Sequence, residues 1–406
     1  MRVTHIITRL VVGGAQENTL ATICGLMSKP GVSVKLIAGP TIGPEGSLEK
    51  EARKVFEPAC AEVAGPPEAC PDFTIIPELV RPVHPLKDLI ALNRLTKILR
   101  QQRPEIVHTH SGKAGLLGRL AAKRAGVPVI IHHIHGPSFG PFQGSLPNLV
   151  FKTAEKYAAG ATDFFFCSAS AMTRLYLHAG IGTPEQFKRI FSGFDLAPFL
   201  RATNDLALRQ KLGLRQEHFV IGKVARIFKL KGHADLLTAF AQVLKPVPQA
   251  RLLFMGDGAL RPEIENQASA LGIRDKVIFA GLVPPTEVAR YIGIMDCLAH
   301  LSYREALSRA LPQALAAGKP VIAYDFDGAD EVCLENQTGF VVHTGDISAA
   351  AKKLVFLAKN PDLRHQFGQS GREFVTENFS IEKMVQDQYD VYVNLWKTRQ
   401  AKACGL

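Results

Sequence analysis

The chain alternates short apolar segments with longer amphipathic segments along most of its length. In the first half, the apolar segments VTHIIT, VSVKLIAG, EIVHTH and VPVIIHHIHG are separated by helical patterns over residues 16–27, 86–101 and 114–125. Strands that are joined by helices of this length pair in parallel, and the helices then cover both faces of the sheet. The first half therefore predicts an open, doubly wound parallel sheet.

The second half repeats this order with its own strands and helices. Its apolar segments FVIGKVARIF, ARLLFMGDG, KVIFAGLV and DCLAHLS alternate with helical patterns over residues 233–244, 260–271 and 286–294. A second doubly wound sheet is therefore expected.

Two further segments set the domain boundaries. Residues 193–207 show weak periodicity and are interpreted as a linker, and residues 380–398 form an amphipathic pattern beyond the last strand. The predicted fold class is α/β, with two Rossmann-like domains that face each other across a cleft, because open parallel sheets bind ligands at the carboxyl ends of their strands. We expect an N-terminal domain over 1–195, a C-terminal domain over 196–378, and a helix within 379–406 that crosses back to the N-terminal domain.

Composition narrows the class of protein. Hydrophobic residues make up 47% of the chain and charged residues 21%, and the seven cysteines include no CxxC pair. Reduced thiols, and an N-terminal segment interrupted by His5 and Arg9, favour a cytoplasmic protein without a signal peptide. The net charge of +11 predicts an anionic ligand or membrane surface. Nucleic acid is not expected, since no basic run with interleaved aromatic residues occurs.

The basic amphipathic segment LKDLIALNRLTKILR has two interpretations. Leu89, Leu92, Leu95 and Leu99 are expected toward one face, with basic residues largely elsewhere. A surface helix of a doubly wound domain accounts for this pattern, and contact with the inner face of an anionic membrane is the alternative.

Two cations follow the first strand of the second half. In GKVARIFKLKGH, Arg226 lies just past the strand and Lys231 lies before the helix that starts near His233. An arginine fork and a lysine point charge suit two adjacent phosphates. Solvated surface cations are the alternative, although cations do not stabilise a helix N-terminus.

The segment REALSRALPQALAAGKPVIA combines a carboxylate with a predicted helix start. Ser308 is the expected N-cap, so Glu305 would precede a helix N-terminus, and Gln313 would lie about two turns further along the same face. A carboxylate beside an anion site suits a ligand that carries both hydroxyls and phosphate.

In the first half, the turn RLVVGGAQENT carries Gly13 and Gly14, which would let the backbone approach a ligand at the helix start. A plain tight turn explains the pair equally well. Neither GxGxxG nor GxxxxGK[ST] occurs, so neither a dinucleotide fold nor a P-loop is supported.

Several histidines gather at two strand ends, namely His108, His110, His132, His133 and His135. A zinc site is the alternative to hydrogen-bonded structural histidines, but no carboxylate or cysteine accompanies them at ligand spacing. The loop at 137–148 contains two phenylalanines that are expected to be exposed, and it is a candidate acceptor loop.

Taken together, these motifs resemble the retaining glycosyltransferases of family 4, the group 1 glycosyltransferases with the GT-B fold. The resemblance covers essentially the whole chain. It implies a donor-contacting loop at Gly13 and Gly14, and diphosphate binding by Arg226 and Lys231. The other residues it implies are His135 near the transferred sugar, Glu305 at the sugar hydroxyls, and Ala306, Leu307 and Ser308 with backbone near sugar and phosphates.

The chain departs from the family pattern at one position. The motif's second glutamate, which usually holds the ribose, is Gln313 here. An amide can still accept from one hydroxyl and donate to another, but it lacks the strength of a charged acceptor.

The expected activity is transfer of a sugar from a nucleoside diphosphate sugar, with UDP implied by family habit, to a sugar or lipid-linked acceptor in polysaccharide or glycolipid assembly. No metal site and no cofactor are predicted, because the nucleotide sugar is a substrate and the letters DFD at 325–327 follow a different strand. An epimerase or sugar-phosphate-forming enzyme of the same fold, or a non-catalytic nucleotide-sugar-binding protein, is the alternative.

Overall fold

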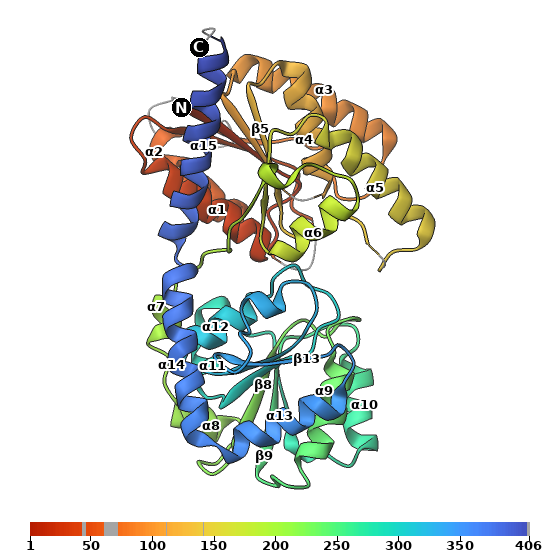
Figure 1. Cartoon of the computed structure of the whole chain (residues 1–406), viewed down its shortest axis with the longest axis vertical. Coiled ribbons are helices and arrows are strands. Elements are labelled where there is room, and N and C mark those ends of the chain that lie inside the picture. The colour runs from red at the N-terminus through yellow and green to blue at the C-terminus, as the bar shows by residue number, and fades with distance from the viewer. Residues whose placement is uncertain (43–45, 61–71, 111, 141, 404–406) are drawn as a thin grey trace. The chain divides into compact units, whose positions relative to one another are not determined.

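The computed structural model describes residues 1–42, 46–60, 72–110, 112–140 and 142–403. The chain forms two compact units. Unit 1 comprises Met1–Phe194 together with Ile381–Leu406, and unit 2 comprises Asp195–Ser380 (Figure 1). Both units are α/β, as predicted.

Unit 1 contains a seven-stranded parallel sheet in the order β3-β2-β1-β4-β5-β6-β7. Its strands are β1 Arg2–Ile7, β2 Ser33–Ala38, β3 Phe73–Ile75, β4 Ile106–His110, β5 Val129–Ile134, β6 Phe164–Cys167 and β7 Phe187–Arg189. Its helices are α1 Gly14–Met27, α2 Glu49–Cys60, α3 Pro85–Gln102, α4 Gly112–Ala125, α5 Ser145–Ala159, α6 Ser170–His178, the 3-10 turn η1 Pro184–Gln186, and α15 Ile381–Ala403.

Unit 2 contains a six-stranded parallel sheet in the order β10-β9-β8-β11-β12-β13. Its strands are β8 Phe219–Val224, β9 Ala250–Met255, β10 Val277–Gly281, β11 Cys297–His300, β12 Val321–Tyr324 and β13 Gly339–Val342. Its α-helices are α7 Ala197–Leu200, α8 Leu206–Lys211, α9 His233–Val243, α10 Arg261–Ala270, α11 Val288–Gly293, α12 Ala310–Ala316, α13 Ile347–Lys359 and α14 Pro361–Asn378. Its 3-10 turns are η2 Arg274–Lys276, η3 Pro285–Glu287 and η4 Ala329–Glu331.

In both sheets the chain reverses its direction of growth at the centre, between β1 and β4 in unit 1 and between β8 and β11 in unit 2. In doubly wound sheets, ligands bind outside the carboxyl ends of the strands at this reversal. The topology therefore singles out the loops after β1 and β4 and the loops after β8 and β11.

The C-terminal helix α15 belongs to unit 1, where it packs along α1 (Figure 1). Gly25 permits the close approach, since a Cβ there would lie 2.5 Å from Cγ2 of Val385. Gln388 Nε2 donates to Thr22 Oγ1 at 3.1 Å in the buried interface. The helix thus completes the apolar cover on one face of the unit 1 sheet.

The segment 193–207, interpreted as a linker, includes the boundary between the two units after Phe194. It also contains α7 and the first residues of α8, because Pro198 suits a first helical turn and Asp205 caps α8 by accepting from Leu208 N at 2.8 Å. The expectation for α3 is wrong at one residue. In α3, the buried stripe begins only at Ala91, so Leu89 is 54% exposed although Leu92, Leu95 and Leu99 are buried.

Among the described residues, no disulfide involves Cys24, Cys167, Cys297 or Cys333. The side chain of Cys60, together with Cys70 and Cys404, lies outside what the structure describes. Within the described residues we find no helix that is both long and apolar enough to cross a bilayer.

Candidate functional site

The loops that follow β8 and β11 are held against each other at the centre of unit 2. Tyr303 N donates to Leu230 O at 2.9 Å, which joins the two loops directly. Gly232, the N-cap of α9, has a φ of 65°, and a Cβ there would lie 1.5 Å from Leu301 O. Only glycine permits both the left-handed conformation and this approach. The turn before α9 can therefore lie directly against the end of β11.

This contact brings together two residues that are 74 positions apart in the chain. Lys231 Nζ donates to Glu305 Oε1 and also lies 3.4 Å from Arg304 O. Glu305 is held from its other side as well, since its backbone N–H donates to Asp327 Oδ2 at 2.7 Å. The predicted phosphate lysine and the predicted sugar carboxylate are therefore a contacting ion pair.

The two aspartates of the DFD sequence have different partners. Asp325 accepts from His343 Nδ1 and from Thr344 N and Oγ1, each at 2.8 Å, and these hydrogen bonds help to hold its pKa low. Burial raises the pKa of Asp327 to about 6, and the nearby Glu305 carboxylate adds to this rise. Asp327 thus supports the Glu305 loop, a role that the sequence analysis missed.

A cavity adjoins Glu305 and lies entirely within unit 2. One wall is the imidazole of His300, whose Nε2 lies 3.9 Å from Glu305 Oε1. Burial lowers the pKa of His300 well below its usual value, so the ring is neutral at pH 7. The lining residues are His300, Ser302, Glu305, Ala306, Leu307, Ser308, Leu311, Tyr324, Phe326 and Ala329. Ala306, Leu307 and Ser308 are therefore brought to the same cavity as Glu305.

The helix in this region begins later than predicted, at Ala310, with Arg309 rather than Ser308 as its N-cap. Pro312 explains the difference. A helix capped at Ser308 would need a backbone N–H from Pro312, whereas with Arg309 as N-cap the proline occupies the third position, whose N–H has no intrahelical acceptor. Ser308 Oγ still accepts from Ala310 N at 3.3 Å.

The later helix start also corrects the geometry predicted for the Glu305–Gln313 pair. Glu305 lies in the loop, and Gln313 is half-buried within α12, where its N–H donates to Arg309 O at 3.1 Å. The two side chains therefore do not share one continuous helical face. Arg226, the other predicted phosphate ligand, is exposed in the β8–α9 loop, and its guanidinium lies over the Phe228 ring at 5.2 Å from the centroid.

The remaining predicted site residues belong to unit 1. Gly13 is the N-cap of α1 in an extended conformation, with a φ of 171°, and Gly14 is the first residue of the helix. His135 lies just beyond β5, half-buried, and its ring stacks on His133 with centroids 3.9 Å apart.

The loop at 137–148 differs from expectation. Phe139 is buried against Tyr176, with ring centroids 5.1 Å apart, and Phe142 is half-buried. The two phenylalanines are therefore not an exposed pair, although Pro141 between them lies outside the described residues.

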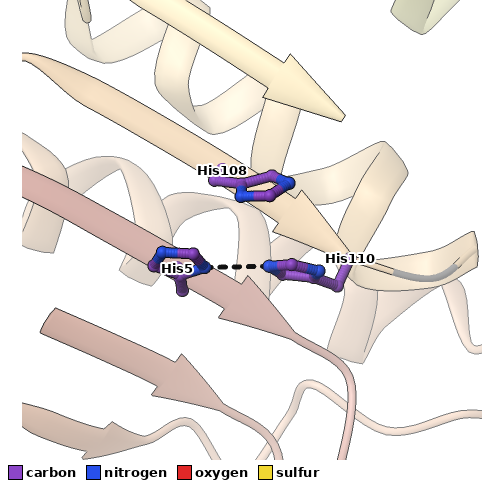
Figure 2. A group of neighbouring side chains, drawn as sticks. All are labelled: His5, His108 and His110. Carbon is purple, nitrogen blue, oxygen red and sulfur yellow. Dashed lines mark hydrogen bonds between the residues drawn. The ribbon is translucent and has the colours of Figure 1, made fainter. Parts of the chain in front are cut away.

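The histidines of unit 1 separate onto the two faces of the sheet. His132 faces α4, with Nδ1 2.9 Å from Thr109 Oγ1. The other face carries His108 and His110, and His5 joins them from β1 (Figure 2). His133 lies on the same face, because its ring stacks on His108 with centroids 5.8 Å apart. His5 was not predicted as a member of this group, although its place in the first strand, next to β4 in the sheet, could have indicated it. Two sets of three rings could each offer one nitrogen to a cation, namely His5, His108 and His110, and His110, His133 and His135.

Comparisons with known proteins identify relatives over most of the chain. The family model for glycosyl transferases group 1 matches residues 204–374, and the model for a glycosyl transferase 4-like domain matches residues 13–187.

Two curated proteins illustrate these relatives. One is UDP-Gal:alpha-D-GlcNAc-diphosphoundecaprenol alpha-1,3-galactosyltransferase of Escherichia coli, which is 27% identical over 324 residues, covering 79% of this chain and 83% of that protein. Another is alpha-monoglucosyldiacylglycerol synthase of Acholeplasma laidlawii, which is 26% identical over 345 residues, covering 80% of this chain and 85% of that protein.

Among solved structures, Anabaena HepE in complex with UDP matches with a TM-score of 0.77 and 20% identity, covering 97% of this chain and all of that chain. This likeness confirms the predicted GT-B fold.

A buried lysine near the Lys231–Glu305 pair of unit 2 was not predicted from the sequence. Lys223 lies on β8, fully buried, and among the described residues its Nζ has no hydrogen-bond partner. Burial, helped by the nearby charge of Lys231, lowers the pKa of Lys223 to about 7. Lys223 could have been recognised from the sequence, because a charged residue is unusual inside a strand that is covered on both faces.

The Lys223→Met variant should be more stable than the parent protein at pH 6.5, and this advantage should shrink as the pH rises. Below pH 7, Lys223 is charged in both the folded and the unfolded state, so its burial cost is fully present. Between the folded pKa of about 7 and the ordinary value of 10.5, the folded form loses the charge and the cost falls. We expect the difference in unfolding free energy to decrease by on the order of 3 kcal/mol between pH 6.5 and 9.5.

Urea unfolding at both pH values measures this change. Lys245→Met, at an exposed lysine in the same unit, is the control and should show a pH-independent difference. A difference for Lys223→Met that stays constant with pH would contradict the assigned pKa.

Proposed function

Because the chain belongs to the group 1 glycosyl transferases, we propose that it transfers a sugar from a UDP-sugar to a hydroxyl of a sugar or lipid-linked acceptor, with retention of the anomeric configuration. The name of the Escherichia coli relative includes a UDP-galactose donor and a diphosphoundecaprenol-linked acceptor, and the structure of the Anabaena protein was solved with UDP. The observation that carries the proposal is the Lys231–Glu305 pair, which lies beside a cavity at the strand reversal of unit 2.

In the proposed reaction, the bond between the anomeric carbon and the β-phosphate oxygen breaks. The acceptor oxygen forms its bond to the same face of that carbon, and the acceptor proton passes to the departing phosphate oxygen. Arg226 and Lys231 neutralise the charge that develops on the diphosphate, so that no divalent metal is required. The backbone of residues 306–308 adds donors at the cavity wall.

Glu305 is assigned to the hydroxyls of the donor sugar. Its carboxylate is held by Lys231, and its backbone is held by Asp327, so the group is oriented before the ligand arrives. In unit 1, we assign His135 to sugar hydroxyls and the Gly13–Gly14 backbone to the donor. Gln313 is assigned to the ribose.

The first test is an assay with a panel of UDP-sugars and lipid-linked acceptors in excess EDTA. We expect acceptor-dependent release of UDP that EDTA leaves unchanged, and a product with the donor's anomeric configuration by NMR. Arg226→Ala and Lys231→Ala should each lower kcat/KM by roughly 10²–10³, as expected for the loss of one stabilising contact in the transition state.

Other outcomes of this assay identify the alternatives. A changed sugar nucleotide, or a sugar phosphate, formed without any acceptor would indicate the epimerase or sugar-phosphate-forming enzyme. Donor binding without UDP release would indicate a binding protein. Loss of turnover in EDTA that metal restores would contradict the metal-independent mechanism.

The second test separates the sugar and ribose assignments. Glu305→Gln should lower kcat strongly while the affinity for UDP stays nearly unchanged. Gln313→Glu should tighten UDP by about 1 kcal/mol, because a hydrogen bond to a charged acceptor is stronger than one to a neutral acceptor. Calorimetric titration with UDP, beside steady-state kinetics, measures both effects.

Gln242→Glu, at an exposed position of α9, controls for the added charge. If Gln313→Glu binds UDP no better than this control does, position 313 does not contact the ribose.

We also infer that unit 1 contacts the inner face of an anionic membrane through α3 and α5. Leu86 and Leu89 on α3 are 70% and 54% exposed, and Leu146 and Leu149 on α5 are 70% and 60% exposed. Both helices contact α4 and carry lysines. Apolar side chains flanked by lysines match the interface of an anionic bilayer.

The Leu149→Ser variant should therefore bind less to vesicles that contain phosphatidylglycerol, while its activity toward water-soluble acceptors is retained. Co-sedimentation with these vesicles and with neutral phosphatidylcholine vesicles measures this binding. Leu282→Ser, at a 77% exposed leucine of unit 2, is the matched control. Equal sedimentation of both variants would exclude α5 from the membrane contact.

A further inference from the structure

Three histidines of unit 1 form a continuous hydrogen-bonded chain that ends at the predicted sugar-contacting residue. His5 Nδ1 lies 2.9 Å from His110 Nε2, and His110 Nδ1 lies 3.0 Å from His135 Nε2. Figure 2 shows the first of these bonds, between a ring on β1 and a ring at the end of β4. This chain of three histidines therefore runs from the buried interior of the sheet to the loop after β5.

All three rings are neutral at pH 7. Burial lowers the pKa of His5 and of His135 to about 3, and it lowers the pKa of His110 well below its usual value, with the neighbouring His108 adding to this effect. A neutral imidazole carries one N–H and one acceptor nitrogen. His110 uses both nitrogens in the chain, so it must donate to one neighbour and accept from the other. The hydrogen bonds therefore all run in the same direction.

The surroundings of His5, at the inner end of the histidine chain, favour one of the two possible directions of the hydrogen bonds. His5 Nε2 is buried, and among the described residues it has no hydrogen-bond partner. If the bonds ran from His135 inward, this nitrogen would carry an N–H without an acceptor. If the bonds run from His5 outward, His5 Nε2 carries only a lone pair. This direction is favoured, because buried donors without partners are rarer than buried acceptors without partners.

We propose that His5 and His110 are positioning residues that hold His135 with its proton on Nδ1, so that His135 presents a hydrogen-bond donor. His5 Nδ1–H donates to His110 Nε2, and His110 Nδ1–H donates to His135 Nε2. The remaining Nδ1–H of His135 is then a fixed donor for a hydroxyl oxygen. The recipient of this bond rests on the proposed function, but the protonation pattern of the three rings does not.

The structure offers a pair of variants that isolate the donor at position 5. His5→Leu removes the N–H that starts the chain. His5→Asn retains a side-chain N–H at a similar distance from the backbone, because the asparagine amide nitrogen occupies nearly the place of Nδ1. His110→Leu removes the middle ring and serves as a second disrupting variant. His132→Leu is the buried control, because His132 belongs to the same sheet but lies on its other face, toward α4.

The experiment reads the tautomer of His135 directly by long-range ¹H–¹⁵N NMR of the full chain labelled at histidine, with the signal assigned through His135→Asn. We expect the proton on Nδ1 in the parent protein, in His5→Asn and in His132→Leu. In His5→Leu and His110→Leu, we expect the His135 proton to redistribute between the two nitrogens. If the proposed function also holds, kcat in these two variants should fall by roughly 10- to 100-fold at nearly unchanged donor KM, and His5→Asn should recover most of it.

Each contrary result has a distinct meaning. A proton on Nε2 of His135 in the parent protein, or an unchanged tautomer in both disrupting variants, would overturn the proposal. Stoichiometric zinc in the purified protein would also overturn it, because ligation would replace the hydrogen bonds between the rings. Absence of sugar transfer together with the expected tautomers would leave the histidine chain standing and count against the proposed function alone.

Discussion

Parallel sheets that are covered on both faces impose one constraint on the whole chain: strand interiors must be apolar, and polar side chains must lie at the strand ends or find partners. The core residues of β8, β9 and β11 satisfy this constraint with phenylalanine, isoleucine, leucine, alanine and cysteine. Arg226, Lys231 and Glu305, which we propose to contact the diphosphate and the donor sugar, lie in loops beyond the carboxyl ends of β8 and β11. Polar groups that break the rule, such as Lys223 and His5, therefore require an explanation of their own.

Much of the fold could be predicted from the sequence, because alternation of strands and long helices is a repeated signal. The family resemblance is confirmed by the two family models. Short elements were not predictable in the same way. The four-residue helix α7 is too short to show a hydrophobic period. The start of α12 is set by Pro312, which has no backbone N–H and must therefore lie where the helix needs none. The preference of serine for N-cap positions did not reveal this constraint.

For the candidate site, the limit of prediction was the distance between residues along the chain. Arg226 and Lys231 lie in the same loop between β8 and α9, which could be inferred from their spacing in the sequence. The ion pair of Lys231 with Glu305, and the support of Glu305 by Asp327, join three separate loops and depend on the close approach that Gly232 permits. The same holds for His5, whose partner His110 lies 105 positions away. Sheet order is needed to place such residues together.

The membership of α15 in unit 1 has a consequence for how the protein is made. The face of the sheet that α15 covers includes apolar side chains that pack with Met384 and Val385, and His108 Nδ1 lies 2.5 Å from the Tyr392 hydroxyl. During synthesis, these partners leave the ribosome only after the whole of unit 2 has been translated. Unit 1 must therefore wait with an uncovered apolar face while unit 2 can already fold. The nascent chain is most exposed to aggregation, and most dependent on chaperones, during that interval.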